Sequence, residues 1–456
     1  MSAYLLEHAW VDGRVQHDVL VELEGSRITS VTPDGDLMRL SGVATPDKRM
    51  NPRSAGDSCT RLRGLTLPGL ANTHSHAFHR ALRGRTQTDR GTFWTWREQM
   101  YAVAGRLDPE TYYALAKATY AEMVAAGYTS VGEFHYLHHQ PDGTPYDDPN
   151  AMGHALLAAA RDAGIRITLL DTLYLSSGFG AASEGVQRRF DDGSAETWQE
   201  RVSALSPLTG ADALIGVAAH SVRAVPADAL KAFARYVADG AAVHVHLSEQ
   251  VKENADCVAA HGVTPTRLLA DHGFLGPMTS AVHATHLTDE DVRLLGEARA
   301  FASFCPTTER DLGDGIGRAR ALQEAGSVLT LGSDSHAIID AFEEMRAVEM
   351  DERLASQARG HWSAAELLAA ATADGHRSLG FADAGAIAVG QRADLVTIDL
   401  ASPRTAGTGG DEHTAVFAAG AADVTHVMVD GKVVFEGDHA VVGRSLDDVI
   451  GRIWTS

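Results

Sequence analysis

Between about residues 65 and 345, short apolar stretches alternate with segments of helical character, and this alternation constrains the fold most strongly. Eight of the apolar stretches have the length and composition of buried strands, at residues 65–73, 130–134, 166–173, 214–219, 242–247, 280–284, 300–304 and 328–332. Eight strand–helix units in about 280 residues match the size of a (β/α)8 barrel. A doubly wound open sheet is the alternative, although no GxGxxG motif follows the first strand.

Helix signals between these stretches support the alternating pattern. Asp108 is a suitable N-cap residue, Pro109 fits the first turn, and Gly127 follows the end of a helix predicted over 109–126. A second helix is predicted to begin after Thr288, three residues before Asp291, which resembles a capping box. Both helices lie between predicted strands.

Further short strands flank the alternating region, at residues 3–6, 19–23, 27–31, 394–399, 424–429 and 432–436. A helical stretch at about 362–380 precedes the C-terminal group, and Asp430-Gly431 is a hairpin signal within it. The sequence therefore predicts an α/β fold. It consists of a TIM-like (β/α)8 barrel over 66–384 and a small β-sandwich-like domain built from both termini, 1–65 and 385–456.

The composition is that of an ordinary globular protein, with 45% hydrophobic and 22% charged residues. The formal net charge of −21 opposes binding to nucleic acid or to anionic membranes. The three cysteines form no CxxC motif and cannot all pair, which fits a reducing compartment. The N-terminus does not have the pattern of a signal peptide, and no apolar run is long enough to span a bilayer. We therefore expect a cytoplasmic protein that binds neither nucleic acid nor membranes.

Histidines and carboxylates collect at the predicted strand ends. His74 and His76 follow the first strand, and residues two apart on a strand point to the same side, so both imidazoles can bind one metal ion. His-x-His alone is a weak signal in a chain with 22 histidines. However, His246, His283 and Asp334 stand at the ends of strands five, six and eight, and these ends meet at one face of a barrel. Their joint placement favours a metal site over isolated structural histidines.

These positions resemble the amidohydrolase superfamily, in which HxH follows strand one, His follows strands five and six, and Asp follows strand eight. Residues 385–394 also resemble the lead-in to the family's C-terminal strands. Two-metal members usually have a bridging carboxylated Lys after strand three or four, whereas here these strands lead into Leu173-Tyr174 and Ala219-His220. The resemblance thus implies one divalent metal per subunit, held by His74, His76, His246 and Asp334. Zinc is the first choice and iron the alternative, because N/O ligands select weakly between them.

The resemblance also implies a division of roles. Glu249, three residues after His246, completes the His-x-x-Glu pattern of the deaminase branch. Three imidazoles and a carboxylate leave an open position for water, whose pKa falls toward ~7. Asp334 can then accept the water proton, and His283 can orient the nucleophile and stabilise charge on the intermediate. Glu249 can carry protons to the substrate nitrogen and to the leaving ammonia.

Four segments resemble the N-formimino-L-glutamate deiminase family more closely: NTHSHAF at 72–78, FWTWRE at 93–98, EFHY at 133–136 and LGDG at 312–315. Enzymes of that family act in histidine degradation and hydrolyse the formimino C=N bond to give N-formyl-L-glutamate and ammonia. The resemblance extends over nearly the whole chain, and the FWTWR segment is its most specific part.

A small anionic dicarboxylate substrate agrees with the cationic and polar residues near the strand ends. Arg97 and Arg223 can bind carboxylates through their planar guanidinium groups, and Tyr136 and His220 can add hydrogen bonds. The family commonly has Gln three residues after His-x-His, near the formimino group, whereas this chain has His79. His79 is therefore the candidate for the formimino contact, and it is also where this chain departs from the family.

Two alternatives remain open at this point. A related aminohydrolase for a purine, a pyrimidine or another amidine would share the metal site, but it would favour stacking aromatic residues over two arginines at the substrate end. A non-catalytic barrel could act as a binding or assembly protein, although such relatives usually lose their metal ligands. For the assembly state we expect a homodimer.

Overall fold

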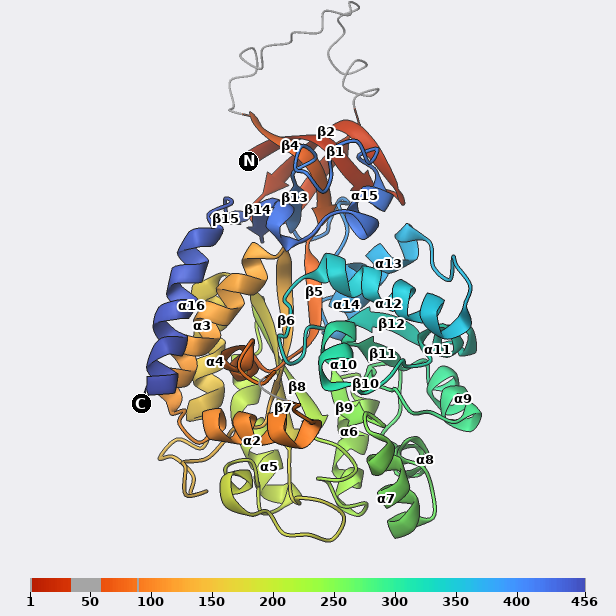
Figure 1. The fold of residues 1–456 in the computed structure, drawn as a ribbon. Helices are drawn as coiled ribbons and strands as arrows, with labels where there is room; N and C mark the ends of the chain where they lie inside the picture. The colour runs from red at the N-terminus through yellow and green to blue at the C-terminus, as the bar shows by residue number, and fades with distance from the viewer. Residues whose placement is uncertain (1, 34–58, 88–89, 456) are drawn as a thin grey trace, which may run out of the picture.

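A closed parallel barrel forms the centre of the computed structural model, which describes residues 2–33, 59–87 and 90–455 (Figure 1). Its strands pair in chain order, and they are β5 (Leu70–Ser75), β6 (Tyr128–His135), β7 (Arg166–Leu173), β8 (Ala213–Ala219), β9 (Val243–Leu247), β10 (Thr279–His283), β11 (Phe301–Phe304) and β12 (Val328–Leu331). A bridge between Ser75 and Asp334 joins the last strand to the first, and the Asp334 amide donates to the His74 carbonyl at 3.0 Å. The predicted (β/α)8 barrel is confirmed.

Strands from both ends of the chain form a second sheet at one end of the barrel. It has seven strands in the order β15-β14-β13-β4-β1-β2-β3. Their bounds are β1 (Ser2–Val11), β2 (Arg14–Glu24), β3 (Arg27–Thr32), β4 (Cys59–Pro68), β13 (Leu395–Ile398), β14 (Val424–Val429) and β15 (Lys432–Phe435). β4 pairs with β1 on one side and with β13 on the other.

The apolar run predicted as one strand over 65–73 is divided between the two sheets. Its first part belongs to β4, and the barrel begins only at Leu70. The break falls at Gly69, where an added Cβ would lie 2.3 Å from the Thr129 Oγ1 atom. The backbone therefore passes too close to its neighbour for any side chain, and the strand changes sheets at this glycine.

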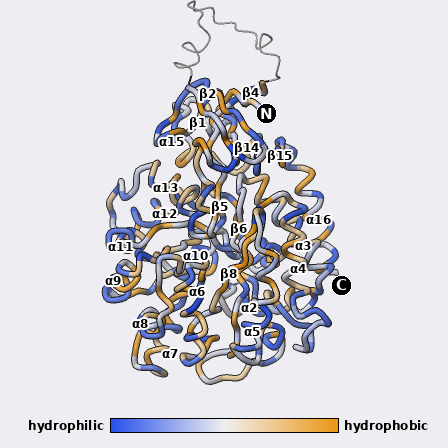
Figure 2. Tube along the Cα trace, turned by 180° about the vertical axis from the view of Figure 1, so that it is seen from behind, coloured by the Kyte–Doolittle hydropathy of each residue, from blue (hydrophilic) through white to orange (hydrophobic). Residues whose placement is uncertain are grey.

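Helices surround the two sheets, and most of them lie on the outside of the barrel (Figure 1). They are α2 (Phe93–Ala104), α3 (Pro109–Ala125), α4 (Ala151–Ala163), α5 (Ala195–Leu205), α6 (Ala234–Ala238), α7 (Val251–His261), α8 (Pro265–Asp271), α9 (Asp289–Glu297), α10 (Pro306–Leu312), α11 (Ala319–Ala325), α12 (Ala341–Ser356), α13 (Ala364–Ala371), α14 (Ala373–Ser378), α15 (Glu412–Phe417) and α16 (His439–Thr455). The predicted caps are present, since Asp108 accepts from the Thr111 amide at 2.8 Å and Thr288 accepts from the Asp291 amide at 3.2 Å. Figure 2 shows apolar residues along the central strands and hydrophilic residues toward the periphery.

The C-terminal helix α16 lies along the barrel beside α3 rather than in the small sheet (Figure 1). The Trp454 indole donates to the Ala81 carbonyl at 2.9 Å, and Arg106 donates to the Ile453 carbonyl at 2.8 Å. The last residues of the chain are thereby held against the segments that follow β5 and α2.

A buried ionic contact joins the small sheet to the barrel. Arg166, at the start of β7, bonds to Asp394 before β13 and lies 3.1 Å from the Asp430 carboxylate in the β14–β15 turn. Arg166 and Asp394 are both about 1% exposed. In the described part of the chain, no helix is both long and apolar enough to cross a membrane.

Candidate active site

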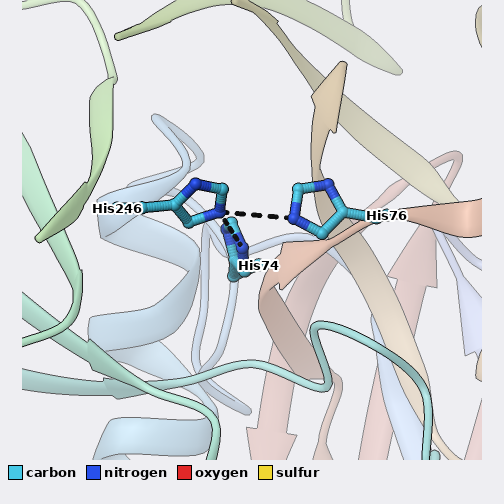
Figure 3. Close-up of side chains that lie close together, drawn as sticks. All are labelled: His74, His76 and His246. Carbon is cyan, nitrogen blue, oxygen red and sulfur yellow. Dashed lines mark hydrogen bonds between the residues drawn. The ribbon is translucent and has the colours of Figure 1, made fainter. Parts of the chain in front are cut away.

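Three imidazoles and a carboxylate converge at the carboxyl ends of the barrel strands. His74 and His76 come from the end of β5, His246 from β9, and Asp334 follows β12. Figure 3 shows the three rings pointing toward one another, with the His246 Nε2 atom 3.1 Å from His74 Nε2 and 3.3 Å from His76 Nε2. Asp334 Oδ1 lies 3.4 Å from His74 Nε2 and 3.3 Å from His76 Nε2. The centre offers three nitrogen ligands and one oxygen ligand.

This donor set fits one divalent cation. The Nδ1 atom of His76 lies 2.9 Å from the Phe134 carbonyl and donates to it, so its Nε2 atom presents a lone pair to the centre. Burial, with the neighbouring His74, lowers the pKa of His76 to about 3, which keeps the ring neutral. Where these Nε2 atoms present lone pairs to one another at about 3 Å, they repel, and a shared cation would turn that repulsion into coordination.

His283, Glu249 and Asp334 form a cluster of titratable side chains at this centre. The His283 Nε2 atom lies 3.7 Å from Asp334 Oδ2 and 4.0 Å from Glu249 Oε1. Burial alone would lower the pKa of His283, but the Glu249 charge and the hydrogen bond with Glu309 outweigh it and raise the pKa to about 10. The arrangement can hold and move a proton between two carboxylates and one imidazole.

The backbone is strained where these side chains leave the barrel. Ser248, His283 and Asp334 have φ values of 52°, 67° and 40°, in the left-handed region that non-glycine residues rarely adopt. Each such residue costs on the order of 1–3 kcal/mol, and such strain concentrates at functional sites. The surrounding structure must therefore hold these turns in place.

One pocket collects the predicted substrate-binding residues. His79, Arg97, Tyr136, His220 and Arg223 line it together with the predicted catalytic residues and all predicted metal ligands except His74, which is fully buried behind them. The His79 Nε2 atom lies 3.0 Å from the Tyr136 hydroxyl, and the Tyr136 and His220 rings meet edge to face with centroids 5.3 Å apart. The pocket thus runs from the metal-ligand centre to the two arginines.

The two arginines already have partners in the pocket wall. Arg223 donates to Glu253 at 3.1 Å and lies 3.9 Å from Glu249. Arg97 donates to the Tyr101 hydroxyl at 2.5 Å. Arg223 is therefore held by a carboxylate from α7, the helix that follows β9, the strand that carries His246.

Three residues that support the site have no role predicted from the sequence, although one of them, Glu133, lies in the EFHY segment at 133–136. Glu133 accepts from the Ser75 hydroxyl at 2.6 Å and the Ala77 amide at 2.7 Å, and so supports the turn that carries His76. Glu253 and Glu309 support Arg223 and His283 from neighbouring helices. Glu133 stands at a strand end, and that position could have marked it. Glu253 and Glu309 had no comparable signal.

A second histidine cluster, His135, His138 and Asp171, lies outside this pocket. Both nitrogens of His138 have partners, since Nε2 lies 3.0 Å from the Thr172 carbonyl and Nδ1 lies 2.5 Å from an Arg201 nitrogen. Arg201 also pairs with Asp171 at 2.9 Å. A guanidinium thus already supplies the positive charge there, which indicates a structural cluster.

Sequence comparison places the chain among known hydrolases. Residues 65–434 match the model of the amidohydrolase family. The formimidoylglutamate deiminase of Pseudomonas aeruginosa is 40% identical over 412 residues, which cover 87% of this chain and 90% of that protein. The 5-methylthioadenosine/S-adenosylhomocysteine deaminase of Pelotomaculum thermopropionicum is 27% identical, over 92% of this chain and 89% of that protein.

Solved structures share the whole architecture. An amidohydrolase from Brucella melitensis superposes with a TM-score of 0.86 and 33% identity, and the match covers all of both chains. An adenosine deaminase from Xanthomonas campestris with bound zinc has a TM-score of 0.81 and 24% identity, over 100% of this chain and 98% of that chain. At 24% identity, the likeness to the Xanthomonas campestris structure shows only a shared fold.

Proposed function

Because the chain belongs to the amidohydrolase family, we propose that it is a metal-dependent hydrolase that converts N-formimino-L-glutamate to N-formyl-L-glutamate and ammonia. One observation carries the proposal: a single pocket joins the His/Asp metal centre to two arginines suited to a dicarboxylate. The identity with a formimidoylglutamate deiminase supports the same substrate.

The metal ligands in this proposal are His74, His76, His246 and Asp334. Three imidazole nitrogens and one carboxylate oxygen suit zinc first, and iron is the alternative. A bound divalent ion supplies Lewis-acid polarisation and brings the pKa of water near neutrality. The centre opens into the pocket, which leaves room for a water molecule beside such an ion.

The hydrolysis needs one water molecule and two proton transfers to nitrogen. Asp334 accepts a proton from the attacking water, while a C–O bond forms at the formimino carbon. Glu249 delivers two protons to the terminal nitrogen, one from the attacking water by way of Asp334 and one from the hydroxyl group of the tetrahedral intermediate. As the formyl C=O bond forms, the C–N bond breaks and ammonia leaves. His283 lies within 4.0 Å of both carboxylates, and it orients the nucleophile and stabilises the charge that develops in the intermediate.

The other end of the pocket binds the glutamate moiety. Arg97 and Arg223 pair with its carboxylates, and Tyr136 and His220 donate hydrogen bonds. His79 stands at the position where the family commonly has Gln, and its Nε2 atom is engaged by Tyr136 at 3.0 Å. The His79–Tyr136 pair therefore takes the place of a single amide side chain near the formimino group.

A substrate panel on zinc-loaded protein tests this proposal. Ammonia release should be much faster from N-formimino-L-glutamate than from guanine, cytosine or adenosine, and it should be lost on chelation and restored by added metal. No turnover of N-formimino-L-glutamate would overturn the proposed substrate. Turnover of a nucleobase or nucleoside instead would favour the second candidate, an aminohydrolase for a cyclic amidine, for which Trp96, Tyr174 and Phe190 in the pocket wall offer stacking surfaces.

A further inference from the structure

The imidazole of His283 is held from behind by a buried carboxylate. Glu309, on α10, places its Oε1 atom 3.3 Å from the His283 Nδ1 atom. The Cys305 amide donates to the same oxygen at 2.9 Å. Glu309 is 6% exposed and His283 is 1% exposed, so water does not compete strongly for this contact.

The contact requires a proton on the Nδ1 atom of His283. As a carboxylate, Glu309 can only accept: its Oε1 atom accepts from the Cys305 amide, and the Nδ1 atom that faces the same oxygen is the donor. The opposite nitrogen, Nε2, then points at Asp334 Oδ2, 3.7 Å away, and at Glu249 Oε1, 4.0 Å away. With Nδ1–H held by Glu309, Nε2 is the ring nitrogen that faces the pocket.

We propose that Glu309 is a positioning residue that fixes the Nδ1-protonated state and the orientation of His283 for the hydrolysis. This inference rests on the proposed function, in which His283 acts on the reacting group. Backbone geometry makes such support necessary, because His283 and Ala284 have φ values of 67° and 47° and lie outside regular strand geometry. A carboxylate behind an imidazole acts in the same way in other enzymes, where it holds one tautomer in place.

An alternative role for Glu309 is to anchor the start of α10 through the Cys305 amide. Glu344, on α12, provides a matched control for that role. It accepts from the Thr307 amide at 3.0 Å and from the Thr307 hydroxyl at 2.5 Å, also at the start of α10. Glu344 is fully buried and its carboxylate bonds to Thr307, whereas no hydrogen bond in the described part of the chain joins it to His283.

The test compares Glu309→Ala, Glu309→Gln and Glu344→Ala on metal-loaded enzyme. We expect Glu309→Ala to lower kcat about 10- to 100-fold with little change in KM, the usual effect of losing a residue that orients a metal-site ligand or imidazole. Glu309→Gln should recover most of the activity, because its carbonyl oxygen can accept from both Nδ1 and the Cys305 amide. Glu344→Ala should lower the melting temperature but leave kcat near that of the wild type. Equal kcat in Glu309→Ala and the wild type, or equal losses in Glu309→Ala and Glu344→Ala, would overturn the proposal.

A spectroscopic measurement decides the same point without a substrate. In ¹⁵N-histidine-labelled enzyme, the Nδ1–H signal of His283, assigned by its loss in His283→Asn, should appear in the wild type and in Glu309→Gln and should shift or vanish in Glu309→Ala. A wild-type spectrum in which His283 Nδ1 carries no proton would refute the proposal even if Glu309→Ala does not fold. If the wild type fails to hydrolyse N-formimino-L-glutamate, the proposed substrate is wrong, while this signal still decides the role of Glu309.

Discussion

Replacement of Arg223 by Met is the sharpest test of the proposal that the pocket binds a carboxylate. Arg223 follows β8, its side chain is 25% exposed, and it donates to the Glu253 carboxylate at 3.1 Å. Met retains much of the side-chain length but removes both the charge and the hydrogen bonds. The change therefore acts on the substrate and on Glu253 at the same time.

The two consequences have different magnitudes and different readouts. A charge-assisted hydrogen bond is worth about 1.5–3 kcal/mol, and 1.4 kcal/mol corresponds to about tenfold, so KM for a carboxylate substrate should rise about 10- to 150-fold. The kcat should change less, because this bond forms equally in the ground state and the transition state. In addition, the fully buried Glu253 carboxylate loses its cation, which should lower the free energy of unfolding by about 3–5 kcal/mol.

The double variant Arg223→Met/Glu253→Gln separates the two effects. Removing the unpaired charge should restore most of the stability and leave KM high. Steady-state kinetics with ammonia detection gives KM, and denaturant midpoints give the change in stability. A folded Arg223→Met enzyme with an unchanged KM would refute the role of Arg223 in substrate binding. A normal KM in the double variant would show that the effect came from Glu253.

Three further predictions concern the metal centre and its supports. His246→Ala should abolish both tight metal binding and turnover. If elemental analysis of the purified variant finds a normal metal content, His246 is not a metal ligand. Glu249→Gln should keep the metal but lower kcat on the order of 10²-fold or more, and near-normal turnover would exclude a proton-transfer role. Burial raises the pKa of Glu133 to about 8 from an ordinary value of 4.5, against the hydrogen bonds from Ser75 and Ala77 that lower it. The folded protein therefore binds the Glu133 proton more tightly than the unfolded chain does. The stability that this proton confers is complete below about pH 4.5 and is lost as the pH rises toward 8. In metal-free protein, the denaturant midpoint should fall less between pH 5 and pH 8 for Glu133→Gln than for the wild type. Equal falls in the two proteins would contradict this prediction.

The barrel and the residues at its strand ends could be predicted from the sequence because both depend on local pattern. Apolar runs at regular spacing predict parallel strands, and parallel strands bring their carboxyl ends to one face. His246, His283 and Asp334 are far apart in sequence, yet each stands at such an end and the structure brings them into one pocket. Conversely, Glu253 and Glu309 lie on helices that follow the strands, and the sequence does not indicate how far a helix turns back over the pocket.

Two features of the fold could not be predicted from the pattern of strands. The run over 65–73 is apolar throughout, so hydrophobicity alone does not show that the chain leaves one sheet and enters another at Gly69. The helix α16 has a clear signal, since its buried residues Leu446, Ile450 and Ile453 are spaced by four and three. The prediction of a β domain at both termini did not use that spacing, and α16 packs on the barrel instead.

The order of strands in the small sheet has a consequence for synthesis of the chain. β4 pairs with β13, and the buried contact between Thr66 and Thr397 joins residues 331 positions apart. At ribosomal rates of about 5–20 residues per second, the N-terminal strands wait about 17 to 66 s for their partner. During that time β4 presents an open apolar edge, which is a template for pairing with another nascent chain. Translation that stops before residue 395 would leave this edge permanently uncovered, so truncated products should be captured by chaperones or aggregate.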